Sequence, residues 1–205
     1  MKREFIIESL NQMIETPKCE LNYNSDYTLL IAILLSAQCL DKQVNKITPI
    51  LFNKYPTLLD LKNAKLEDLI SIIKPLGLAN NKAKSIKALS TILVEEYNSK
   101  VPTNRETLTK LPGIGIKTSG VFLSEYYNQN YLPVDTHVKR VSYRLGLTNE
   151  TDSIVKIEET LSKFFNYENL NIIHLQLVLF GRHICKSKKP DCNKCKFKGK
   201  CLLTR

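Results

Sequence analysis

The stretch LTKLPGIGIKTSG, residues 108–120, predicts two helical segments joined by a tight turn. Gly113 and Gly115 allow backbone conformations that other residues avoid, and they let a ligand approach the main chain closely. The turn also presents free N–H groups at the start of the second helix, which form an anion site that suits a phosphate. A Gly-x-Gly turn alone is weak evidence, because a helical corner packed inside a core has the same pattern.

Lys117 stands two residues after this turn, in the first turn of the second helix. A positive charge is poorly placed there, because the helix dipole already puts partial positive charge at that end. Either the side chain contacts phosphate, or it is partly desolvated and held as a neutral, nucleophilic amine. A nucleophile would need a carboxylate as proton acceptor, and Asp135 in PVDTHVKR is the candidate. The alternative is that Asp135 only caps a helix.

The composition favours a polyanionic partner. The 205 residues include 30 Lys and Arg against 20 Asp and Glu, which gives a formal net charge of +10. Nucleic acid is the first expected partner and an anionic membrane surface the second, although scattered solvated lysines would give the same total. No signal peptide is recognisable, and no apolar run approaches the roughly 20 residues that span a bilayer. We expect a monomer in the cytoplasm, at the nucleoid if the source is bacterial, with no membrane contact.

Helical periodicity runs through nearly the whole chain, and no strand pair with a hairpin turn is recognisable. The expected helices cover residues 27–37, 81–97, 105–110, 116–127, 136–145 and 171–182, with further apolar stripes near 5–14, 66–73 and 154–164. Another helix should start near Asp41, and Pro49 should kink or shorten it. The sequence therefore predicts an all-α fold.

Four cysteines near the C-terminus have the spacing C-x6-C-x2-C-x5-C: Cys185, Cys192, Cys195 and Cys201. In a cytosolic chain such a cluster indicates a metal site, because disulfides are rare in that compartment. Soft thiolate ligands suit zinc or an iron–sulfur cluster, and the spacing does not choose between them. Cys19 and Cys39 lack ligand spacing and are expected to be ordinary thiols.

The segment between these cysteines is strongly basic. It carries seven lysines, at positions 186, 188, 189, 194, 196, 198 and 200, against one acid, Asp191. A loop tied by a metal holds such lysines at fixed positions, so that they contact phosphates at a smaller entropic cost. Lys189 is the predicted DNA contact among them. The alternative is that the metal only staples a small domain and the lysines are solvated.

Read together, these segments resemble the endonuclease III family, which are bifunctional DNA glycosylases of the helix-hairpin-helix superfamily. The resemblance rests on LPGIGIKT (residues 111–118), PVDTHVKRV (residues 133–141) and the four cysteines. LLIAILLSAQCLDKQVNK and IKPLGLANNKAKSI resemble the helical core of the family. The similarity runs from about Glu20 to Cys201.

The resemblance implies two α-helical lobes. Residues 20–132 would form a six-helix barrel that contains the hairpin. Residues 1–19 and 133–205 would form a second lobe with a [4Fe–4S] cluster bound by the four cysteines. Double-stranded DNA containing damaged bases or abasic sites would be the partner.

The resemblance also implies a reaction, in which Lys117 is the catalytic lysine and Asp135 the catalytic aspartate. The expected activities are those of a base excision repair enzyme: a DNA glycosylase that removes oxidised pyrimidines through a lysine Schiff base, and an apurinic/apyrimidinic lyase that cuts the strand by β-elimination. Gln38 would fill the space left by the flipped base, and Leu78 would wedge into the duplex. Gly113 and Gly115 would contact phosphate.

The sequence departs from the family pattern in two places. Ser119-Gly120 follows the lysine where the family usually has Ala-Asn, and Ala79 follows Leu78 where a larger residue is common. Two other functions remain open. A monofunctional relative that removes adenine opposite oxidised guanine lacks the hairpin lysine, so Lys117 argues against it. A non-catalytic zinc-type DNA-binding module would be colourless and would release no base.

Overall fold

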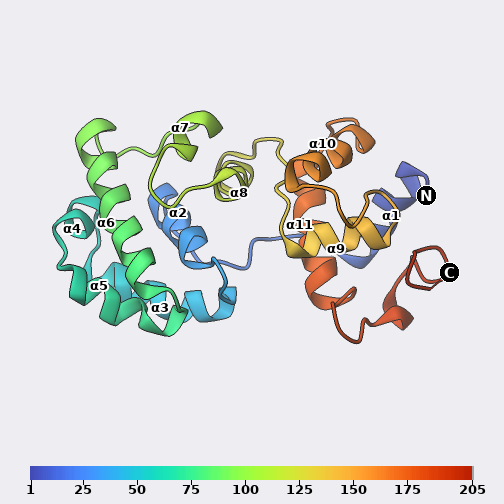
Figure 1. The fold of residues 1–205 in the computed structure, drawn as a ribbon, viewed down its shortest axis with the longest axis horizontal. Helices are drawn as coiled ribbons and strands as arrows, with labels where there is room; N and C mark the ends of the chain where they lie inside the picture. Colours follow the sequence, from blue (N-terminus) through green and yellow to red (C-terminus); the bar gives the residue numbers. More distant parts are fainter. Residues whose placement is uncertain (205) are drawn as a thin grey trace. The chain divides into compact units, whose positions relative to one another are not determined.

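The structure, a computed structural model, describes residues 1–204, and all regular elements in that range are helices (Figure 1). The predicted all-α fold is confirmed. None of the helices in residues 1–204 is both long enough and apolar enough to cross a membrane.

The chain folds into two compact units. The hairpin unit comprises residues 19–127, and the cysteine unit combines residues 1–18 with residues 128–205. The helices of the hairpin unit are α2 (Asp26–Leu35), α3 (Asp41–Lys54), α4 (Leu58–Asn63), α5 (Leu66–Ile73), η1 (Lys74–Leu76), α6 (Ala79–Glu96), α7 (Arg105–Thr109) and α8 (Ile116–Tyr127). Those of the cysteine unit are α1 (Arg3–Met13), α9 (Thr136–Arg144), α10 (Ile154–Phe164), α11 (Leu170–His183) and η2 (Cys192–Lys194).

Helix α2 forms the centre of the hairpin unit. Its residues from Thr28 to Leu35 are all buried, and it packs against α3, α6 and α8. A capping box at Ser25 and Thr28 satisfies the free N–H groups at its start. A helix that is apolar on all sides is buried, because it has no polar face that could be exposed to water.

Two local predictions were incomplete. Pro49 lies inside α3, which continues to Lys54, so the proline does not end that helix. The short helix α4 was not predicted, although Thr57 and Asp60 form a capping box at its start. The T-x-x-D pattern was the sequence signal for it.

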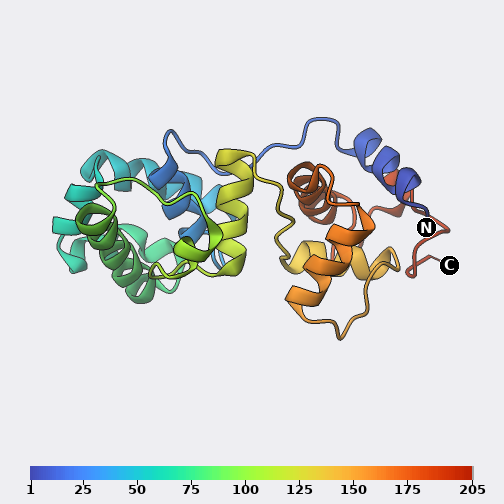
Figure 2. The same cartoon turned by 90° about the horizontal axis from the view of Figure 1, so that it is seen from above.

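The cysteine unit has its own apolar core, to which both ends of the chain contribute (Figure 2). Helix α1 packs on α11, and α9 packs on α10 and α11. Helices α9 and α11 approach closely at Gly181, where an added Cβ atom would lie 2.9 Å from Cβ of His137. The core therefore joins the N-terminal helix to the segment that carries the four cysteines.

Candidate nucleic-acid interface and metal centre

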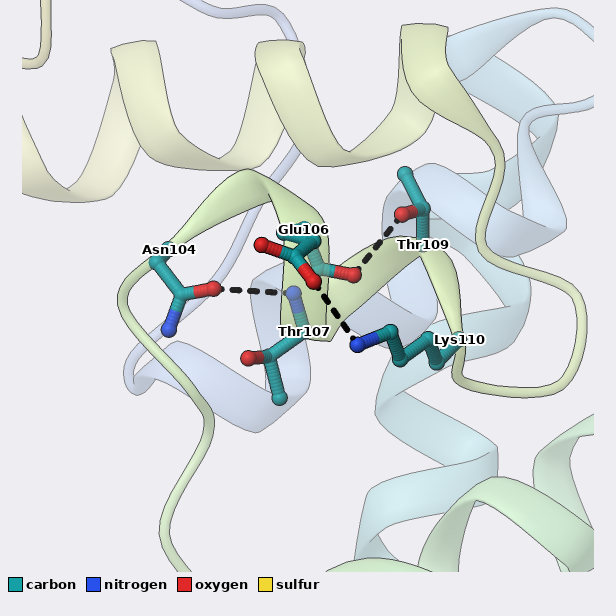
Figure 3. Close-up of polar contacts among 5 residues, drawn as sticks. All are labelled: Asn104, Glu106, Thr107, Thr109 and Lys110. Carbon is teal, nitrogen blue, oxygen red and sulfur yellow. Dashed lines mark hydrogen bonds and ion pairs between the residues drawn. The ribbon is translucent and has the colours of Figure 1, made fainter.

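The hairpin begins with α7, a helix of five residues that is closed by side-chain hydrogen bonds (Figure 3). The side chain of Asn104 caps its start by accepting the Thr107 N–H at 2.8 Å. The Thr109 hydroxyl donates to the Glu106 carbonyl at 2.9 Å, and Lys110 Nζ lies 2.9 Å from the Glu106 carboxylate. These bonds hold a helix that is too short to be stable by itself.

The two glycines of the turn have different surroundings. Gly113 has a φ of +78°, and a Cβ atom there would lie 2.8 Å from Ser85 Cβ and 2.9 Å from Leu34 Cδ1. Gly115 is exposed, and an added Cβ would have no neighbour within 4 Å. Gly113 is also exposed, but the side where a Cβ would lie faces α6 and α2, so glycine is required there for packing. Gly115 has no such constraint, and the contact of either glycine with phosphate stays a prediction.

The first turn of α8 presents an exposed lysine above a buried layer. Lys117 is exposed, whereas Ser119 and Gly120 are buried. The Ser119 hydroxyl and Nη2 of Arg105 both donate to the Ile116 carbonyl, at 2.9 and 3.1 Å. The departure at Ser119-Gly120 thus lies on the inner side of the helix, away from the exposed surface that carries the lysine.

The exposure of Lys117 bears on the two alternatives for this residue. Partial desolvation was one of them, and the structure has the side chain exposed to solvent. The lysine is therefore accessible to a ligand, and its role as a phosphate contact or as a nucleophile stays a prediction.

Asp135 is the N-cap of α9, and its carboxylate accepts the Val138 N–H at 2.7 Å. Asp135 therefore caps α9. Two residues later, Nδ1 of His137 lies 3.2 Å from Nη2 of Arg140, and burial lowers the pKa of His137. Lys117 belongs to the hairpin unit and Asp135 to the cysteine unit, and their catalytic pairing stays a prediction.

Gln38 and Leu78, the two residues expected to enter the duplex, share an unusual backbone conformation. Their φ angles are +56° and +51°, in the left-handed region that residues with a side chain rarely adopt. Both are exposed, and 53% of the Leu78 surface is accessible. Strained conformations of this kind cluster at functional sites.

Lys82 was missed by the sequence interpretation. It is a buried lysine on α6 whose Nζ donates to the Leu76 carbonyl at 3.0 Å. The helical period was the available signal, because Lys82 lies on the same face of α6 as Ile86 and Leu89, whereas the exposed Lys84 does not.

The four cysteines line one hollow. Cys201 is buried and the other three are partly buried, and burial raises the pKa of Cys195. Nη1 of Arg144 on α9 lies 3.4 Å from Sγ of Cys185 and donates to the Lys186 carbonyl at 2.7 Å. Arg140, also on α9, donates to the Cys185 carbonyl at 3.2 Å, so two arginines hold the position where the cysteine segment leaves α11.

The cysteine segment is also held against α1. Phe197 is fully buried, with its ring centroid 6.0 Å from that of Phe5 and 5.5 Å from that of Phe180. The Lys196 N–H donates to Sδ of Met13 at 3.4 Å. The seven lysines of the segment are all exposed. Lys189 is among them and has a φ of +49°.

The donor set of the hollow fits an iron–sulfur or zinc site in ligand number and softness. Four thiols from one short segment surround it, and the carboxylate of Asp191, which also lines it, lies 3.4 Å from Nζ of Lys194. In residues 1–204 no group of three or more His, Cys, Asp or Glu side chains is already arranged to hold a metal ion. In the described residues, the four cysteine side chains therefore surround one hollow but are not arranged to bind a single ion together.

Comparison with known proteins gives similarities along almost the whole chain. Residues 31–167 match the family model of the HhH-GPD superfamily of base excision DNA repair proteins. Endonuclease III of Bacillus subtilis (strain 168) is 40% identical over 198 residues, which are 97% of this chain and 90% of that protein. Endonuclease III of Rickettsia felis (strain ATCC VR-1525 / URRWXCal2) is 41% identical over 196 residues, 96% of this chain and 92% of that protein.

A solved structure of a trapped endonuclease III–DNA covalent intermediate, in an estranged-adenine complex, has the same fold. Its TM-score is 0.93 at 40% sequence identity, with 98% of this chain and 96% of that chain covered. The similarity includes the hairpin, both units and the cysteine segment, since so little of either chain is left unmatched.

Proposed function

Since the chain belongs to the endonuclease III family of HhH-GPD base excision repair proteins and is a DNA glycosylase, we propose that it removes oxidised pyrimidines and then cuts the strand as an apurinic/apyrimidinic lyase. The resemblance to this family that the sequence predicted is confirmed. The observation that carries the proposed lyase activity is the exposed amine of Lys117 in the first turn of α8.

DNA is the partner of this fold, as in the endonuclease III–DNA complexes that it resembles. The open backbone at Gly115 and the N–H groups at the start of α8 suit a phosphate. The exposed lysines of the cysteine segment, Lys189 included, supply a second cationic surface. We propose that the protein acts as a monomer in the cytoplasm.

A base must leave the helical stack before it can react, which costs a few kcal/mol of stacking and pairing. Leu78 would occupy the stack and Gln38 the vacated space, so that the extruded state is stabilised relative to the closed duplex. The exposure and left-handed backbone of both residues support these roles.

Lys117, as the free amine, would attack C1′ of the extruded nucleotide while the bond to the base breaks and the base leaves with the bonding electrons. Asp135 would accept the proton that the amine loses and stabilise the positive charge on the sugar. Opening of the sugar ring gives a Schiff base between Nζ and C1′. Removal of a 2′ proton then expels the 3′ phosphate, which breaks the strand by β-elimination.

The residues around the hollow would hold a [4Fe–4S] cluster through Cys185, Cys192, Cys195 and Cys201. Such a cluster supplies a redox-capable metal centre, but the proposed reaction needs it only to order the basic segment. Metal analysis and visible absorption of fresh protein test this assignment. Zinc without iron would overturn it.

Borohydride trapping tests the catalytic proposal. The protein is incubated with duplex DNA containing thymine glycol or an abasic site, and the reductant then converts any Schiff base into a stable adduct. We expect an adduct with the native protein and none with Lys117→Ala. Lys110→Ala is the matched control, because Lys110 is an exposed lysine that directly follows the other helix of the same hairpin.

The proposal fails if Lys117→Ala forms the adduct at the native rate. A protein that binds DNA but traps nothing and releases no base would instead be a non-catalytic member of the fold.

A further inference from the structure

Lys82 is almost completely buried, with 5% of its surface exposed. Burial of an ammonium group is costly, and it lowers the pKa of Lys82. Nothing in the proposed chemistry uses this amine. Its partner is the Leu76 carbonyl, 3.0 Å from Nζ.

The position of that carbonyl gives the lysine a specific place in the DNA-contact surface. Leu76 ends η1 and is followed by Gly77 and Leu78, which both have positive φ angles of +69° and +51°. The backbone N–H of Lys82 donates to the Leu78 carbonyl at 3.0 Å. Lys82 therefore binds the segment on both sides of the left-handed turn, through its side chain at Leu76 and its backbone at Leu78.

The same helix also contacts the hairpin and the helix that precedes Gln38. One turn further along α6, Ser85 lies against Gly113 of the hairpin. Helix α6 also packs against α2, the helix after which Gln38 lies. The beginning of α6 thus supports the turn at Leu78 and the hairpin, two of the segments that are expected to contact DNA in this unit.

We propose that Lys82 is a positioning residue for base extrusion, an inference that rests on the proposed function. Its amine holds the Leu76 carbonyl so that the turn at Gly77 and Leu78 keeps its left-handed conformation and projects Leu78 from the surface. Without this bond the turn relaxes toward conformations that an L-leucine prefers, and the exposed side chain loses its fixed direction.

Lys82→Met tests the proposal, because methionine keeps a long unbranched stem and removes the donor. Single-turnover rates are measured on duplex DNA with thymine glycol, which requires extrusion of a base, and on duplex DNA with a preformed abasic site, which does not. We expect a loss of roughly tenfold or more on the first substrate and little change on the second, because a displaced positioning group affects only the step it serves. Lys82→Arg, which retains a cationic donor, should recover part of the loss.

Lys87→Met is the matched control. Lys87 lies on the same helix, is partly buried, and donates to the carbonyls of Lys62 and Ala64 at 2.8 and 2.6 Å, away from the turn. Its loss should lower thermal stability and reduce the activity on both substrates by the same factor. Lys82→Met should change the ratio between the two substrates.

A readout without chemistry separates this inference from the proposed function. Fluorescence of 2-aminopurine beside a tetrahydrofuran abasic analogue reports unstacking of the duplex when the protein binds. The native protein should raise the fluorescence and Lys82→Met should raise it less at saturation, even if neither protein traps a Schiff base. If Lys82→Met does not fold, Lys82→Leu, which also removes the donor, is measured in its place.

Equal losses on both substrates together with native fluorescence would overturn the positioning role and leave Lys82 a structural residue. Native rates of Lys82→Met on thymine glycol would overturn it as well. Failure of the native protein in borohydride trapping would overturn the proposed lyase reaction, and the fluorescence experiment would still decide the role of Lys82.

Discussion

Gly113→Ala should destabilise the hairpin unit, because two independent costs meet at this residue. The φ angle of +78° is unfavourable for alanine, and the new Cβ would lie 2.8 Å from Ser85 Cβ and 2.9 Å from Leu34 Cδ1. Both distances are shorter than van der Waals contact, so α6 or α2 would have to move.

The expected size follows from these two terms. A left-handed L-residue costs about 1–2 kcal/mol. Overpacking by one methyl group costs about 1–3 kcal/mol, depending on how far the neighbours can shift. The Leu34 methyl is the end of a flexible side chain, which favours the middle of that range. The free energy of unfolding should fall by about 3 kcal/mol, and the melting temperature by about 6–12 °C for a chain of this size.

Thermal unfolding followed by circular dichroism measures the change, with Gly115→Ala as the control. An added Cβ at Gly115 has no neighbour within 4 Å, so its melting temperature should remain within about 2 °C of native. Gly115→Ala should instead weaken binding to duplex DNA, because the methyl group keeps a phosphate away from the open backbone.

Ser85→Gly in the Gly113→Ala background separates the two costs. It removes the Ser85 atoms that lie 2.8 and 3.0 Å from the new Cβ but leaves the φ angle unchanged. The double variant should be more stable than the sum of the single variants predicts, by about 1 kcal/mol. A melting temperature of Gly113→Ala equal to the native value, or a strictly additive double variant, would refute the reasoning from packing.

Three further predictions concern the cysteine unit. Asp135→Ala should abolish base release, and it should also lower the stability by about 1 kcal/mol because the helix cap is lost. Asp135→Asn should keep the cap and lose only activity. Unfolding curves and single-turnover rates distinguish the two variants. Because burial holds the pKa of His137 below its ordinary value of 6.5, the unfolded chain binds more protons at this residue, so stability should fall as the pH decreases through about 6.5. Urea unfolding at pH 7.5 and 5.5 should show a smaller difference for His137→Gln than for the native protein. Arg144→Met should cost about 0.5–1.5 kcal/mol, because the exposed Lys186 and Ser187 carbonyls exchange their donor for water. Metal analysis after dialysis should also detect weaker retention of the metal. Unchanged melting and retention would contradict this role.

Local patterns in the sequence were sufficient for most of the helices, α4 excepted. The cap at Asp135 and the helix start before Lys117 depend on neighbouring residues only, so the chain shows them directly. The spacing of the four cysteines likewise predicts their convergence, and the structure places all four around one hollow. Pro49 was expected to kink or shorten its helix; α3 continues to Lys54, so it is not cut short at the proline, and the kink stays a prediction.

Contacts between distant residues determined the remaining features. Only the packing of the turn against Ser85 and Leu34 separates the structural glycine, Gly113, from the open one, Gly115. The burial of Lys82 and the exposure of Lys117 are also set by which helices surround each residue. Periodicity and capping act over a few residues, and so the sequence by itself determined the helices, their caps and the family. The surroundings of each lysine and glycine depend on the three-dimensional packing of helices that are far apart along the chain, and only the tertiary structure decided them.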